Sequence, residues 1–249
     1  TGLPFGFNQR QHNAWMYYGG GLQLVNELMK EYSVTFFPGG NTGCQMGGWW
    51  RIEIKSLADL KGLKFRIPGI GGEVWSKLGV VPQTIPGGDI YPALERGTID
   101  GAEWVGPYDD EKLGFYKVAP HYYFPGWWET GSGLGFVVNL KQWASLPKEY
   151  QAAFETAAAE ANTLMIANYD AKNPLALQRL VNNGVKLHQF SKEIMSACYK
   201  SAYEIYADEA GKNPTFRKIF EPWNKFRKAQ VAWFRIGEQA QDNFISSVK

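Results

Sequence analysis

Short apolar runs separated by Gly and Pro dominate the first half of the chain. Runs of this kind are typical of buried strands, and we expect strands at 34–37, 64–67, 80–81, 99–104 and 135–139. Helical spacing between them predicts helices at 13–30 (interrupted by three glycines), 72–78 and 90–96, the last capped by Asp89 and closed by Gly97. Strands and helices that alternate through short connections predict a mainly parallel sheet with helices on its faces.

The second half of the chain has the spacing of amphipathic helices. One helix is expected over 148–169, with Pro174 breaking or restarting it, and a last strand over 185–190. Helices then continue from 191 onward, punctuated at Pro214 and Pro222. Sheet-forming segments lie on both sides of an aromatic tract at 107–129, which predicts two α/β lobes with the chain crossing between them.

Length and composition are those of a globular protein. The 249 residues are 45% hydrophobic and 20% charged, enough for one large domain or two modest lobes with cores. A net charge of +2, with Lys and Arg scattered, gives no footprint for nucleic acid. No apolar run approaches the ~18 residues of a membrane span. Cys44 and Cys198 form no disulfide framework and no metal quartet; buried thiols are the favoured interpretation, and one disulfide is permitted.

Most catalytic interpretations of the sequence find no support. His12, His121 and His188 lie in unrelated contexts, and none belongs to a nucleophile motif. The glycine clusters match neither a phosphate loop nor a dinucleotide fingerprint, so tight turns explain them better. The tryptophan pairs at 49–50 and 127–128 could stack on sugars, although packing in a core or cleft wall is the more common role.

Charged residues near the expected strand ends are the strongest chemical signal in the residues themselves. Arg66 lies near the end of one strand, Glu103 ends another, and Glu129 follows Trp128 in the aromatic tract. Ligands of open α/β sheets bind beyond the carboxyl ends of strands, so Arg66 and Glu103 are expected to face one crevice. An Arg there offers a planar fork to a carboxylate, and two acids beside aromatic residues need a cation to stay ionised. Surface charges or a structural ion pair are the alternatives.

Four motifs resemble the solute receptors of tripartite ATP-independent periplasmic (TRAP) transporters. They are NTGCQMGGW at 41–49, LKGLKFR at 60–66, GDIYPALERGTIDG at 88–101 and EWVGPYDD at 103–110. Together with YY at 122–123 and PGWWE at 125–129, they resemble the branch that binds 2-oxo monocarboxylates such as pyruvate, and related hydroxy acids. The resemblance covers essentially the whole chain. It implies a non-enzymatic, periplasmic receptor that hands its ligand to a membrane permease, and it permits a homodimer.

The resemblance also implies a site. Arg66 would pair with the ligand carboxylate, while Gln45, Glu103, the Trp104 carbonyl and Glu129 would hold a cation that touches the ligand as well. A carboxylate and a keto oxygen can complete the oxygen shell of one hard ion, and both Na⁺ and Ca²⁺ fit this set. Trp104 and Tyr108 would line apolar walls that limit ligand size. No organic cofactor is implied.

The implied fold is a two-lobed, periplasmic-binding-protein-like α/β structure with long C-terminal helices. The first lobe is placed at 1–36 and 101–138, with helices 206–249 packed on it, and the second at 37–100 and 139–205. Members of the family normally carry a signal peptide and the opening strands of the first lobe ahead of Gly2. Here the segment is absent, so we expect an incomplete first lobe whose open sheet edges weaken stability and ligand closure.

Two other classes of function compete with a receptor. A metal-dependent lyase or hydrolase would use Glu103 and Glu129 as acid and base. A carbohydrate-binding protein would use the four paired tryptophans, and it would need them exposed together with several neutral hydrogen-bonding side chains.

Overall fold

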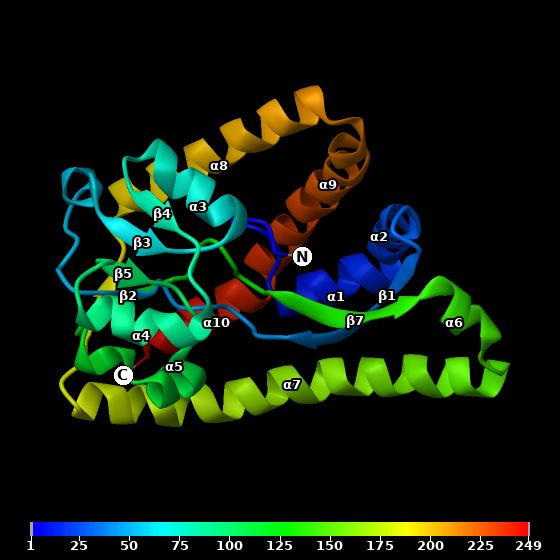
Figure 1. The fold of residues 1–249 in the computed structure, drawn as a ribbon, viewed down its shortest axis with the longest axis horizontal. Coiled ribbons are helices and arrows are strands. Elements are labelled where there is room, and N and C mark those ends of the chain that lie inside the picture. The colour runs from blue at the N-terminus through cyan, green and yellow to red at the C-terminus, as the bar shows by residue number, and fades with distance from the viewer. Residues whose placement is uncertain (1, 249) are drawn as a thin grey trace.

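A six-stranded sheet at one end of the molecule holds most of the predicted strands (Figure 1). The computed structural model describes residues 2–248. The strand order is β4 (Val81–Gln83), β3 (Lys64–Arg66), β5 (Gly101–Ala102), β2 (Trp49–Trp50), β6 (His121–Phe124) and β8 (Lys186–Gln189). β3 is parallel to β4 and β5, and β6 is parallel to β8, whereas β2 is antiparallel to both neighbours. The expected mainly parallel sheet is therefore interrupted at its centre by β2, which the apolar pattern did not predict.

A second, two-stranded sheet joins the two ends of the molecule. β1 (Val34–Asn41) pairs antiparallel with β7 (Gly133–Asn139), from Val34 opposite Asn139 to Asn41 opposite Gly133. β1 was expected to stop at Phe37, but it continues through Pro38 because the register shifts between Pro38 and Gly40. A bulge on an edge strand tolerates the missing N–H of proline.

One long helix spans the molecule beneath both sheets. α7 (Lys148–Asn182) follows α6 (Leu140–Ser145) and runs to α5 (Pro107–Leu113) (Figure 1). The predicted break at Pro174 is wrong, because the helix continues through it. An interior proline costs roughly 3 kcal/mol. Contacts beyond it offset that cost: Leu180 is fully buried, and Arg179 donates to both carboxylate oxygens of Glu111 on α5, at 2.8 and 2.7 Å.

Two helices and two short 3-10 turns flank the six-stranded sheet. They are α3 (Gly69–Lys77), α4 (Gly87–Glu95) and two short 3-10 turns, Leu57–Leu60 and Phe115–Lys117. α4 starts three residues earlier than the expected start at Ile90. Its cap is Pro86, so Asp89 is not the cap; it lies in the first turn, where the helix dipole favours a carboxylate. Gly97 closes the segment with a φ of 70°.

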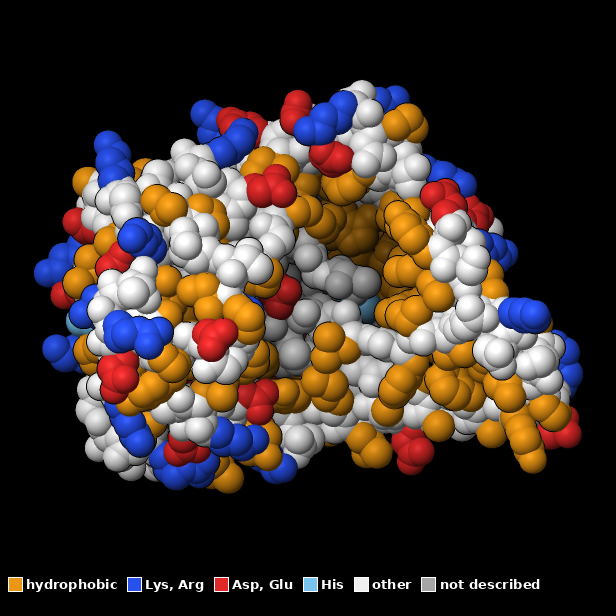
Figure 2. Space-filling model, viewed as in Figure 1, with side chains coloured by type: hydrophobic (Ala, Val, Ile, Leu, Met, Phe, Trp, Pro, Cys, Tyr) orange, Lys and Arg blue, Asp and Glu red, His pale blue; other side chains and the backbone are white. Residues whose placement is uncertain are grey.

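The remaining helices surround an apolar recess. α1 (Gln9–Tyr18) and α2 (Gly21–Lys30) are separated by glycines as predicted, and α8 (Lys192–Lys212), α9 (Pro214–Ile236) and α10 (Glu238–Ser247) complete the chain. Asn213 separates α8 from α9 and caps α9 by accepting from the Phe216 N–H at 3.0 Å, whereas Pro222 lies inside α9 without ending it. A cavity of about 530 Å³ lies between α1, α2 and α9, and Figure 2 shows its hydrophobic lining.

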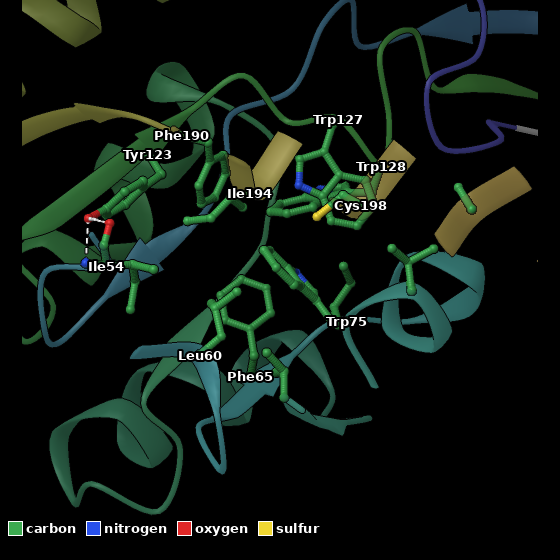
Figure 3. Packing of buried hydrophobic residues seen from close by; sticks show 14 of the residues in the cluster. Ile54, Leu60, Phe65, Trp75, Tyr123, Trp127, Trp128, Phe190, Ile194 and Cys198 are labelled. Carbon is green, nitrogen blue, oxygen red and sulfur yellow. Dashed lines mark hydrogen bonds between the residues drawn. The ribbon is translucent and has the colours of Figure 1, made fainter. Parts of the chain in front are cut away.

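An aromatic cluster forms the core behind the six-stranded sheet (Figure 3). Trp75 of α3 is fully buried, and its ring centroid lies 5.1 Å from that of Trp127 and 6.0 Å from those of Trp50 and Phe190. The two tryptophan pairs are at most 2% exposed, so they cannot stack on a sugar and the carbohydrate-binding alternative is wrong. Cys198 is buried in the same cluster, while Cys44 is exposed; both are free thiols.

The sheets do not divide where the predicted lobes divide. β5 and β6 belong to the six-stranded sheet together with β3 and β4, so this sheet crosses the predicted boundary between residues 100 and 101. The division into lobes stays a prediction. None of the helices in residues 2–248 combines the length and apolar character that crossing a membrane requires.

Truncating the central tryptophan tests how much this core contributes. Trp75→Ala removes a fully buried indole and should lower the free energy of unfolding by about 3–5 kcal/mol, measured by urea denaturation. Tyr18→Ala, at a side chain that is 95% exposed, is the control and should stay within about 0.5 kcal/mol of the parent. Equal effects of the two substitutions would contradict the placement of the core.

Candidate functional site

A cavity of about 340 Å³ opens where β3 and β5 end. Glu103 and Glu129 supply its acidic groups. Its other lining residues are Gly2, Pro4, Ile67, Pro68, Gly69, Ile70, Gly71 and Trp128. The chain can turn sharply there because Gly69 takes a φ of 66°, in the left-handed region that favours glycine. The structure thus has a cavity beyond the ends of these strands, where the sequence predicted a crevice.

Arg66 and Glu103 meet at the edge of this cavity, as the strand-end argument predicted. Arg66 Nη1 contacts a carboxylate oxygen of Glu103, and Arg66 Nε donates to the Ile85 carbonyl at 3.1 Å. The Glu103 N–H in turn donates to the Arg66 carbonyl at 3.0 Å. The Arg66 guanidinium lies 5.3 Å from the ring centroid of Trp104, an attractive cation–π distance. β3 and β5 therefore fix the guanidinium in position from several sides.

Burial sets the electrostatics of both acidic groups. It raises the pKa of Glu103 to about 8; the charge of Arg66 opposes this shift, and Glu129 and Asp110 add to it. Burial also raises the pKa of Glu129, against hydrogen bonds from the Ser132 and Gln45 side chains. The two carboxyls thus disfavour each other's ionised form, and Arg66 alone does not neutralise both.

Gln45 lies beside Glu129 and carries a side-chain oxygen that accepts no hydrogen bond from residues 2–248. Its N–H donates to the Glu129 carbonyl at 3.1 Å, and its Nε2 lies 3.4 Å from the Thr42 hydroxyl. Its Oε1 is buried and has no hydrogen-bond partner among residues 2–248. A buried oxygen without a partner, on a residue that contacts Glu129, is a neutral donor of the kind that suits a hard cation. No group of three or more His, Cys, Asp and Glu in the described chain is arranged to hold a metal, so an ion here needs the neutral oxygens too.

Of the predicted site residues, Glu103 and Glu129 line this cavity, whereas Gln45, Arg66, Trp104 and Tyr108 lie outside its lining. The ring of Trp104 lies over the Arg66 guanidinium and packs against Gly87 at the start of α4. Tyr108 lies on α5 against α7, where its hydroxyl accepts from Lys172 Nζ at 3.1 Å. The apolar residues that line this cavity are Ile67, Ile70 and Trp128, and walls formed by Trp104 and Tyr108 stay a prediction.

Asp110 is a residue of this region to which the sequence analysis gave no role. It is 1% exposed; Oδ1 accepts from the N–H groups of Val105 and Gly106 at 3.2 and 3.1 Å. Oδ2 accepts from Trp49 Nε1 at 2.9 Å and the Tyr122 hydroxyl at 2.7 Å. One carboxyl thus ties β2 and β6 to the loop after Glu103. The sequence offered one indication of its importance, because Asp110 is the last residue of the motif EWVGPYDD.

Comparison with known proteins places this geometry in a family. Residues 1–213 match the family described as bacterial extracellular solute-binding protein, family 7. The chain belongs to this family. Its members are binding proteins, so the lyase or hydrolase alternative falls away.

Two proteins with similar sequences indicate the kind of ligand that such receptors bind. A monocarboxylate 2-oxoacid-binding periplasmic protein of Nostoc sp. is 53% identical over 247 residues, which cover 99% of this chain and 68% of the relative. A TRAP transporter solute-binding protein of Bordetella bronchiseptica, a mixed-occupancy dimer with calcium and picolinate, superposes with a TM-score of 0.97 at 57% identity, covering 99% of this chain and 74% of that one.

A third protein was solved with a different ion. The TRAP periplasmic solute-binding protein of Pseudoalteromonas atlantica, with bound sodium and pyruvate, has a TM-score of 0.94 at 41% identity, covering 100% of this chain and 75% of that one. The periplasmic-binding-protein-like fold with long C-terminal helices is thereby confirmed.

Substituting Asp110 should change how stability depends on pH. Burial raises the pKa of Asp110 from 3.8 to about 7. The folded state therefore binds more protons than the unfolded chain between about pH 4 and pH 7, and this contribution to stability is lost as the pH rises through that window. Asp110→Asn has no carboxyl to titrate, so its free energy of unfolding should not show this decrease. Between about pH 4 and pH 7, the difference in the free energy of unfolding between variant and parent should therefore change by up to about 1.4 kcal/mol per pH unit.

Urea denaturation at several pH values, in cation-free buffer, measures this difference. Asp242→Asn on α10 is the matched control for the chemical change. A parallel pH dependence of the parent and Asp110→Asn would contradict the assignment.

Proposed function

We propose that the protein is the extracytoplasmic receptor of a TRAP transporter, and that it binds a small 2-oxo or 2-hydroxy monocarboxylate, such as pyruvate, together with one cation. The observation that carries the proposal is a small cavity lined by Glu103 and Glu129, where Arg66 pairs with Glu103 and Gln45, whose buried Oε1 has no hydrogen-bond partner in residues 2–248, lies beside Glu129. The receptor would release its ligand to a membrane permease from the periplasm. Relatives named for 2-oxoacids, or solved with pyruvate or picolinate, support this ligand class.

The size of the cavity supports a small ligand. A volume of about 340 Å³ is near the lower end of ligand pockets, which run from roughly 300 to 1,000 Å³. Ile67, Ile70 and Trp128 leave apolar walls that suit a short alkyl group, and none of the three carries a charge that could pair with a second carboxylate. We therefore infer a preference for monocarboxylates over dicarboxylates.

The cation follows from charge balance. When both acids are ionised, they and a carboxylate ligand bring three negative charges to one site, and Arg66 supplies one positive charge. A bridging Na⁺ or Ca²⁺, held by Glu103, Glu129, Gln45 and the Trp104 carbonyl, offsets the remaining repulsion. Bound near Glu103, it would also release Arg66 from neutralising that carboxylate, so the guanidinium could meet the ligand carboxylate.

Removing the guanidinium fork should weaken ligand binding. Arg66→Lys keeps the charge but loses the bidentate geometry, so pyruvate binding should weaken by roughly 1.5–3 kcal/mol in calorimetric titrations with calcium present. Arg66→Met should bind more weakly still. Arg51→Lys, an exposed position, is the control and should bind as the parent does. Unchanged affinity in Arg66→Met would remove Arg66 from the site.

Ligand and cation should depend on each other by the same factor. Each supplies charge that the other needs, so pyruvate should tighten calcium binding as much as calcium tightens pyruvate binding. Glu129→Gln keeps the shape of the side chain and should reduce both this coupling and the affinity for pyruvate. Titrations with and without EDTA, in sodium-free buffer, measure the four affinities. Equal pyruvate binding in both buffers would exclude a bridging cation.

A further inference from the structure

Two histidines that lie far apart in the sequence form a close pair at the edge of the six-stranded sheet. β6 and β8 run parallel, with His121 opposite Lys186 and Tyr123 opposite His188. This pairing brings His121 Nδ1 within 2.9 Å of His188 Nε2. Both rings are partly exposed, so ions in solution can reach them. The sequence around these two histidines gave no indication of this contact.

The pair has a supporting shell. Glu53 Oε1 lies 3.8 Å from His188 Nδ1, on the other nitrogen of the ring. The Tyr123 ring stacks on the ring of His188, with centroids 4.9 Å apart and planes 19° apart. The Tyr123 hydroxyl accepts from the Ile54 N–H at 2.6 Å and donates to the Ile54 carbonyl at 3.1 Å (Figure 3), which fixes the stacking surface.

Glu53 favours one tautomer of His188. A carboxylate near Nδ1 favours the proton on that nitrogen, so the lone pair of His188 is on Nε2 and faces His121. With that tautomer, His121 Nδ1 donates in the 2.9 Å contact, so a metal that binds both nitrogens must shift this proton to His121 Nε2. A carboxylate behind a histidine is the arrangement that orients imidazole ligands in metal sites.

We propose that His121 Nδ1 and His188 Nε2 bind a divalent transition metal of the Zn²⁺ or Cu²⁺ class, with water completing its coordination. Imidazole nitrogens suit these ions, whereas Na⁺ and Ca²⁺ prefer oxygen, so this site is chemically distinct from the cavity at Glu103. Tetrahedral zinc with bonds of about 2.0–2.1 Å places two nitrogen ligands about 3.3 Å apart. The rings then separate by about 0.4 Å, which is a small rotation for partly exposed side chains.

Neighbouring charges predict how the site responds to pH. Burial lowers the pKa of His121, as do His188 and Lys186, while Glu53 opposes this shift. Lys55 pairs with the same Glu53, at 3.4 Å. Because both ligand nitrogens must be unprotonated, the metal competes with protons, and its affinity falls as the pH is lowered.

Titration of the intact chain with ZnCl₂ tests the proposal. Calorimetry is carried out at pH 7.5 with excess calcium, which occupies the oxygen-donor site, and one zinc per chain is expected. His121→Gln and His188→Gln should each weaken zinc binding by at least about tenfold, and Glu53→Gln should weaken it by roughly 10–100-fold. Binding by the parent should also weaken at pH 5.5.

Two controls make the result decisive. Glu129→Gln alters only the cavity for the proposed ligand, so its zinc affinity should match that of the parent. Thermal unfolding of each variant shows whether it is folded. If one histidine variant is unstable, the zinc affinity of the other still tests the proposal. The proposal is overturned if the parent binds no zinc, if His188→Gln and His121→Gln bind it as the parent does, or if Glu129→Gln abolishes it.

Discussion

The burial of Glu103 and Glu129 at one cavity is the constraint around which the rest of the structure is arranged. Carboxyls taken out of water lose hydration, and proximity adds repulsion, which is why the pKa of Glu103 rises to about 8 even beside Arg66. A buried ion pair of this kind is weak support for stability. The proposed function gives the pair a role of a different kind, because its charges would be complementary to a ligand and a cation.

A site with unfavourable charges needs a rigid frame. Asp110 joins β2, β6 and the loop after Glu103 through four hydrogen bonds, and the ring of Trp49 stacks on that of Tyr122 with centroids 3.8 Å apart. On the other face of the sheet, the cluster around Trp75 packs aromatic rings against the strand that carries Arg66. The short strands β2 and β5 form few backbone hydrogen bonds, so side-chain packing holds them in register.

The sequence predicted those features that depend on local pattern. Arg66 and Glu103 were placed at one crevice because the carboxyl ends of neighbouring strands share an edge, and the structure has them in contact. The continuation of α7 through Pro174 was missed because contacts of Leu180 and Arg179 outweigh a local penalty. The packing of Tyr108 against α7 was also not predicted, because its hydroxyl accepts a hydrogen bond from Lys172, which is distant in the sequence.

The pairing of His121 with His188 shows the same limit from another side. Nothing near either residue in the sequence signals a partner, because the contact exists only through the register of β6 against β8. Oxygen donors gather where strands end, and here imidazoles gather at a sheet edge, so the fold separates hard from softer ligands by position. This separation would help a receptor that binds its ligand together with a cation. A transition metal would bind the nitrogens of His121 and His188, so the oxygens at Glu103 and Glu129 would remain available to the cation that the ligand requires.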